Sequence, residues 1–284
     1  LKHVELSSNL GSIPNNMFCG CKSLEELTIP SSATDIRFDA FRDCISLKKI
    51  TIPSSVKKIC FGVFKGCNSL AQIDIPSSVT EIENDTFENC SLLQKIDLPP
   101  SLEKIQNGLF KGCTSLQQIT IPSSVTSIEH SVFTGCTSLT EISLPSSVTN
   151  IEHSVFTGCT SLTEIVLPSS VKIICKYSFR DCSSLIKVSF PSCLTCIEMY
   201  AFCGCSSLEQ LSFPSSLEKI GKRAFNDCSS VKEVIINSDS IDIHNFAFNN
   251  CYSIEKVMIS SIKVKIEFAA FMKCKEKSVF LFFS

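Results

Sequence analysis

The hydrophobic positions of this chain recur with a constant step of 23 residues. Phenylalanine occupies twelve positions at this step, and a cysteine follows three residues after each. The phenylalanine column comprises Phe18, Phe41, Phe64, Phe87, Phe110, Phe133, Phe156, Phe179, Phe202, Phe225, Phe248 and Phe271. The cysteine column comprises Cys21, Cys44, Cys67, Cys90, Cys113, Cys136, Cys159, Cys182, Cys205, Cys228, Cys251 and Cys274. Residues 128–142 and 151–165 are identical. Such a period indicates a repeat protein whose units stack on their neighbours.

A single repeat predicts its own elements. Residues 162–167 end in alternating apolar and polar positions, which is typical of a short strand. Pro168 follows, and proline has no amide hydrogen with which to continue a sheet. Residues 171–174 predict a second short extended piece, and the variable residues before Phe179 predict a short helical turn or a 3-10 piece.

Stacking aligns like residues of successive repeats, so the pattern predicts a mainly β solenoid. We expect a parallel concave sheet of about 13 short strands, with the helical turns on the convex side. The chain is expected to form one domain over residues 1–284, with about 12 repeats. Residues 1–18 form a divergent N-terminal repeat, and residues 237–284 form degenerate C-terminal repeats, in which Asn237 and Ser260 replace proline. Degenerate end repeats are typical of a cap.

These residues resemble a known family. The motif of Leu162, Ile165, Leu167 and Pro168, followed by Val171, Ile174, Phe179 and Cys182, resembles the BspA-like leucine-rich repeats of the Treponema pallidum type. The Leu-x-x-Ile-x-Ile-Pro-Ser-Ser-Val motif most resembles the protist members of the family, such as those of Trichomonas and Entamoeba. The resemblance implies a leucine-rich-repeat solenoid, an α/β horseshoe-type superhelix. It also implies surface proteins that adhere to host cells, matrix or other microbes, and it implies no catalysis.

Composition narrows the classes of partner. The formal net charge of −2 argues against nucleic acid, whose partners usually carry a basic face. We also expect no membrane span, because the chain has no run of about 18 apolar residues. The chain starts and stops inside a repeat, at Leu1 and Ser284, so we expect a fragment whose targeting signals would be missing.

Eighteen cysteines raise the question of disulfides. Twelve of them form the column above, among apolar positions, so we predict buried free thiols. The pair Cys193 and Cys196 could form a local disulfide. It stands alone, without the second pair that a zinc site of this type requires.

The candidate binding surface is the outward side of the strands, because a rigid array of exposed side chains suits recognition. The candidate residues are Glu26, Lys49, Gln72, Lys95, Gln118, Glu141, Glu164, Lys187, Gln210, Glu233, Lys256, Ile235, Met258 and Leu281. A solvated surface of mixed charge is the simpler interpretation of any one of them.

Three of these candidates, Ile235, Met258 and Leu281, are apolar and lie on successive repeats. An exposed apolar strip tends to mark an interface, and further chain could equally cover it. We expect self-association through the C-terminal end as a further contact, because an uncapped sheet edge pairs with other chains.

The sequence offers little chemistry. His130 and His153 each follow a glutamate and could chelate a metal together, but the duplication alone explains their recurrence. No nucleophile elbow, P-loop or dinucleotide motif occurs. We therefore expect no catalytic residues, no metal and no cofactor.

The prediction is a non-enzymatic protein-binding module, cell-surface or secreted, that mediates adhesion through its concave face. The alternative is a cytoplasmic protein-interaction scaffold, which the many cysteines favour because thiols stay reduced in the cytosol.

Overall fold

The computed structural model describes residues 4–274 and, for the backbone, residues 279–283. The chain divides into two compact units, Leu1–Pro145 and Ser146–Ser284, each of which is a coil of parallel strands. The single domain expected over residues 1–284 stays a prediction. No helix is found among the described residues, hence none long and apolar enough to cross a membrane.

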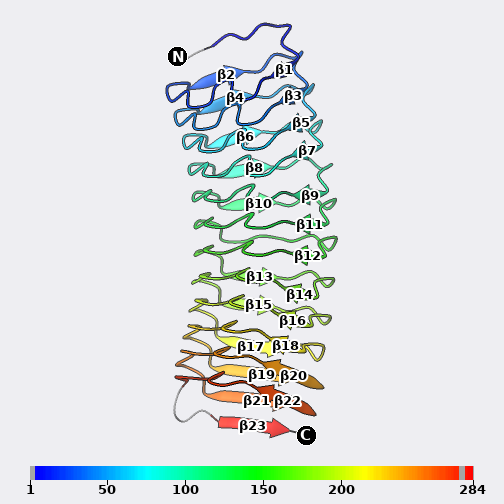
Figure 1. The fold of residues 1–284 in the computed structure, drawn as a ribbon, viewed down its shortest axis with the longest axis vertical. Coiled ribbons are helices and arrows are strands. Elements are labelled where there is room, and N and C mark those ends of the chain that lie inside the picture. Colours follow the sequence, from blue (N-terminus) through cyan, green and yellow to red (C-terminus); the bar gives the residue numbers. More distant parts are fainter. Residues whose placement is uncertain (1–3, 275–278, 284) are drawn as a thin grey trace. The chain divides into compact units, whose positions relative to one another are not determined.

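The first unit carries two columns of short strands (Figure 1). The first column contains β2 (Glu26–Thr28), β4 (Lys49–Thr51), β6 (Gln72–Asp74), β8 (Lys95–Asp97) and β10 (Gln118–Thr120). The second contains β1 (Ser12–Ile13), β3 (Asp35–Ile36), β5 (Lys58–Ile59), β7 (Glu81–Ile82), β9 (Lys104–Ile105) and β11 (Ser127–Ile128). Pairing is parallel between equivalent positions of successive repeats, as in Leu27 with Ile50.

The second unit repeats this arrangement. Its first column contains β13 (Glu164–Val166), β15 (Lys187–Ser189), β17 (Gln210–Phe213), β19 (Glu233–Asn237), β21 (Lys256–Ser260) and β23 (Val279–Phe283). Its second column contains β12 (Asn150–Ile151), β14 (Ile173–Ile174), β16 (Cys196–Ile197), β18 (Lys219–Ile220), β20 (Ser240–Ile243) and β22 (Lys263–Ile266).

The mainly β, parallel solenoid is therefore confirmed, with differences in detail. Residues 4–6 form no strand, and residues 141–143 contribute a single bridge, between Ser143 and Thr120. The second extended piece is a regular strand column of its own.

Stacked aromatic rings form the centre of each unit. From Phe18 to Phe133, successive rings lie with centroids 5.2 to 5.8 Å apart and nearly parallel. From Phe156 to Phe271 the separations are 4.9 to 5.3 Å. Ten of these rings are almost entirely removed from solvent, so the inward column predicted from the period is confirmed.

The column thiols lie beside the rings and are free, and all of them are buried as predicted except Cys21 and Cys274, which are half-buried. The Cys67 thiol donates to the Phe41 carbonyl at 3.1 Å, and the Cys205 thiol donates to the Phe179 carbonyl at 3.0 Å. The same bond recurs along both units. These thiols thereby satisfy carbonyls of the preceding repeat, which accounts for a small polarisable residue at this position. Cys193 and Cys196 are also free, so the local disulfide is absent.

The short helical turns expected before each phenylalanine are replaced by successive β-turns. Around Phe18, the amides of Asn16, Phe18 and Gly20 donate to carbonyls of the next repeat at 2.9, 2.8 and 2.7 Å. Asn16 and Gly20 adopt the left-handed conformation, with φ of 56° and 70°. Amides that bond along the stack cannot form bonds within a helix, so this segment pairs with its neighbours much as the strands do.

Candidate functional site

The outward side of the first strand column is the candidate surface. In β2, β4, β6, β8, β10 and β13 the central residue is buried and the two flanking residues are exposed. The buried apolar residue fixes which way its neighbours point, because successive side chains of a strand alternate. The structure thus exposes the predicted residues Glu26, Lys49, Gln72, Lys95, Gln118, Glu141, Glu164, Lys187 and Gln210, and leaves Glu233 and Lys256 half-buried.

Acidic, basic and amide side chains are mixed along this surface, which we call the strand face. In the first unit, Gln118 Nε2 donates to Glu141 Oε1 at 3.0 Å. In the second, Gln210 Nε2 donates to Glu233 Oε2 at 3.1 Å, and Lys256 Nζ lies 3.0 Å from Glu233 Oε1. Neighbours that pair with one another hold these long side chains in place, so the strand face presents a mixed and partly ordered polar surface.

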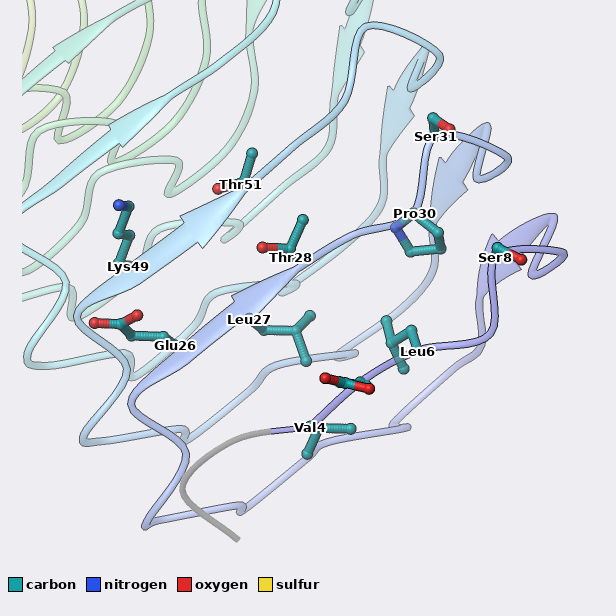
Figure 2. A pocket seen from close by; sticks show the side chains of 11 residues that line it. Val4, Leu6, Ser8, Glu26, Leu27, Thr28, Pro30, Ser31, Lys49 and Thr51 are labelled. Atoms are coloured by element: carbon teal, nitrogen blue, oxygen red, sulfur yellow. The ribbon is translucent and has the colours of Figure 1, made fainter.

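The first unit carries a hollow at its N-terminal end, shown in Figure 2. The hollow has a volume of about 700 Å³, and its walls are residues 4–8 on one side and β2 with β4 on the other. Glu26 and Lys49 stand at one side of it, and Thr28 and Thr51 lie further along the same strands. A second hollow of about 330 Å³ follows between β4 and β6, bordered by Lys49 and Gln72. The strand face of this unit is therefore not flat.

The sequence did not predict the larger hollow. It forms where residues 4–8 leave the regular repeat, and the available signal was Ser7, which replaces the proline found in most repeats.

The apolar strip of the second unit is in register but is only partly exposed. Ile235 pairs with Met258, and Met258 pairs with Leu281, so the three positions adjoin as predicted. The side chains of Ile235 and Met258 are half-buried, and the side chain of Leu281 lies outside the described residues. Val166, at the equivalent position in β13, is 67 % exposed.

The two histidines singled out by the sequence fall in different units, His130 in the first and His153 in the second. Among the described residues, His153 lies close to Glu198 and Cys175. Its Nδ1 lies 3.9 Å from Glu198 Oε2, and Cys175 lies beside both residues. This cluster could not be recognised from the sequence, because its members come from three repeats and from two different repeat positions.

Comparison with known proteins places the repeat in a family. The family model described as BspA type leucine rich repeat region matches residues 1–114, 34–163 and 149–278. No curated protein matches the chain.

Solved bacterial structures resemble it along much of its length. A leucine rich cell surface protein from Faecalibacterium prausnitzii is 30 % identical, with a TM-score of 0.62, over 95 % of this chain and 82 % of that one. A leucine-rich repeat protein from Bacteroides ovatus is 27 % identical, with a TM-score of 0.50, over 96 % and 87 %. The leucine rich repeat protein of T. pallidum is 32 % identical, with a TM-score of 0.51, over 57 % and 78 %.

The family model covers residues 1–278, and the structure shows inward phenylalanine and cysteine columns along the matched repeats. The chain belongs to the BspA-type leucine-rich-repeat family.

Proposed function

We propose that this chain is a non-enzymatic cell-surface module that binds protein partners through its strand face and mediates adhesion to host cells, matrix or other microbes. The observation that carries the proposal is the strand face itself, with exposed side chains flanking a buried residue on repeat after repeat. Such arrays suit extended protein recognition. The surface location has the support of the F. prausnitzii relative, which is described as a cell surface protein.

Mixed charge on this face favours proteins as partners. Acidic, basic and amide side chains are mixed along the strands, and no two lysines of the candidate column are neighbours, so no basic stretch is available for a polyanion. The hollows beside Lys49 offer recesses in which a partner side chain could be enclosed, and enclosed contacts contribute most of the binding energy at protein interfaces.

The experiment measures binding of the purified chain to cultured epithelial cells and to immobilised matrix proteins. The test variant carries Glu141→Lys, Glu164→Lys and Lys187→Glu, all on the strand face. A matched control carries Glu103→Lys, Glu218→Lys and Lys222→Glu, which are exposed elsewhere and change the net charge equally. We expect binding to weaken at least tenfold in the test variant alone. Equal binding by both variants would exclude these three positions of the strand face.

The second candidate is a cytoplasmic interaction scaffold. It is favoured by the eighteen free cysteines, because the cytosol keeps thiols reduced. Surface biotinylation of the source cell separates the two: labelled protein on intact cells supports adhesion, and labelling only after lysis supports the scaffold. The closer likeness to protist members of the family also remains a prediction.

Self-association through the C-terminal end remains a proposal, and the exposure of apolar residues there supports it. Ile262 and Phe268 are 79 % and 82 % exposed, and all four residues of β22 are exposed. Sedimentation should show a concentration-dependent dimer that Phe268→Lys abolishes. A monomer at every concentration would refute this contact.

A further inference from the structure

Three potential metal ligands converge on one side of the second unit. His153, Cys175 and Glu198 follow β12, β14 and β16, so they come from three successive repeats. Their ligand atoms all lie within 4.8 Å of one another, and each residue is half-buried. The central repeat contributes the short cysteine, and the longer histidine and glutamate reach toward it from either side.

The three equivalent positions in the first unit hold a different set of residues. Five repeats earlier, Phe38, Cys60 and Glu83 occupy the places of His153, Cys175 and Glu198. Phenylalanine is no ligand, and Lys58 forms an ion pair with the Glu83 carboxylate. In the second unit the imidazole replaces the phenyl ring.

The neutralising lysine is also replaced. Ile173 occupies the place of Lys58, so that position offers Glu198 no ammonium group. At these two positions the second unit therefore carries a metal ligand in place of the phenyl ring and an apolar residue in place of the lysine.

The carboxylate is held in the same way in both places. The Lys176 amide donates to Glu198 Oε2 at 3.0 Å, and the Phe61 amide donates to Glu83 Oε2 at 2.8 Å. Backbone bonds of this kind orient a ligating side chain before a metal arrives. The fold thus positions the glutamate whether or not a metal ligand stands opposite it.

A second triad, Asp242, His244 and Glu267, serves as a contrast. Lys265 Nζ lies 3.2 Å from Asp242 Oδ2 and 3.6 Å from Glu267 Oε1. The Lys265 ammonium group therefore already neutralises the carboxylates of that triad, and the triad contains no sulfur ligand. The cysteine triad is the better match to a borderline-soft ion.

We propose that His153, Cys175 and Glu198 form a Zn²⁺ site, with water completing a tetrahedron, that ties three successive repeats of the second unit together. Imidazole nitrogen, thiolate sulfur and carboxylate oxygen are the three ligand types that Zn²⁺ accepts in proteins. On binding, the Cys175 S–H bond breaks, the sulfur bonds to zinc, and the proton is released to solvent.

Zinc binding at this cluster has to displace the thiol proton of Cys175. Burial raises the pKa of the Cys175 thiol to about 12. The nearby Glu198 and Glu152 carboxylates and Cys196 push it in the same direction, and the Lys176 ammonium opposes them. A divalent cation reverses that balance, because its charge favours the thiolate.

The test is a titration of the metal-free, reduced full-length chain with Co²⁺ and with Zn²⁺. Thiolate coordination to Co²⁺ produces a charge-transfer band in the near ultraviolet, and Zn²⁺ should displace it. We expect the band in the wild type and in Cys60→Ser, the matched control five repeats away. Cys175→Ser and His153→Ala should lose it, with Zn²⁺ affinity reduced roughly 100-fold or more.

A second readout separates metal loss from misfolding. Each variant should retain the metal-free melting temperature of its parent to within a few degrees, while only the wild type and Cys60→Ser gain stability from Zn²⁺. The site would be refuted by a wild type without the band, by a band that survives in Cys175→Ser, or by equal loss in Cys60→Ser.

Discussion

From Phe18 to Phe110, glycine and Asx residues alternate at one left-handed position two residues after each phenylalanine. Asp43 and Asn89 have φ of 57° and 60°, and Gly66 and Gly112 have φ of 74° and 73°. A Cβ on Gly66 would lie 2.3 Å from Asp43 Oδ1, and a Cβ on Gly112 would lie 2.2 Å from Asn89 Oδ1. The Asx side chain of one repeat therefore fills the space above the glycine of the next, which explains the alternation.

Gly66→Ala should accordingly be more destabilising than an ordinary left-handed glycine substitution. Gly20→Ala is the matched control, because Gly20 has a φ of 70° and no atom near its would-be Cβ. We expect the control to cost about 1–2 kcal/mol for the left-handed backbone alone, and Gly66→Ala to cost more. Urea unfolding of both variants measures the difference, and equal costs would show that the Asp43 contact is unimportant.

Each repeat forms one turn of the coil. A phenylalanine ring, a cysteine thiol and two short strands hold it in place. Phe156 is completely buried, and its ring lies 5.2 Å from that of Phe179. Its carbonyl accepts the Cys182 thiol at 3.1 Å. Because each ring is packed by its neighbours, a missing ring leaves a cavity that adjacent repeats share.

Phe156→Ala should lower the free energy of unfolding by ~3–5 kcal/mol, the usual cost of such a cavity. Phe38→Ala, at a ring that is 47 % exposed, should change it by less than about 1 kcal/mol. Chemical denaturation followed by circular dichroism provides both values. A melting curve that Phe156→Ala leaves unchanged would contradict the inward column.

At the scale of the whole molecule, many buried thiols give the fold a common sensitivity to alkali. Burial raises the pKa of Cys44 and Cys90 from 9.0 to about 12. Folded thiols therefore keep protons that unfolded thiols release between these values. Because the folded state then binds more protons than the unfolded state, the free energy of unfolding falls as the pH rises.

We expect the free energy of unfolding to decline from about pH 9 toward pH 12, the window that these pKa values define. Cys90→Ala should decline less steeply than the wild type, because one buried thiol no longer contributes. Cys19→Ala, at an exposed thiol, should follow the wild type. Identical pH slopes for Cys90→Ala and the wild type would contradict the role of the buried column.

The features that depend only on the 23-residue period could be predicted from the sequence. The positions of the rings, the thiols and the outward strand residues follow from the constant step, because equivalent residues meet in a regular stack. Features that depend on the path of the chain between repeats did not follow. The hollow beside Lys49 needs the course of residues 4–8, and the convergence of His153 with Cys175 and Glu198 needs the reach of side chains from three repeats. The prediction of helical turns was wrong because backbone amides such as that of Phe18 donate hydrogen bonds to the next repeat.

The central claim is that each unit is a coil with its thiols inside and its strand face outside, and thiol accessibility tests it most directly. Eighteen free thiols should react in denaturant without reductant. In the native metal-free chain, rapid reaction should be confined to the six that are not buried: Cys19, Cys21, Cys175, Cys193, Cys196 and Cys274. Mass spectrometry of the labelled peptides identifies them. Rapid native labelling of Cys90, Cys136 or Cys205 would contradict the account.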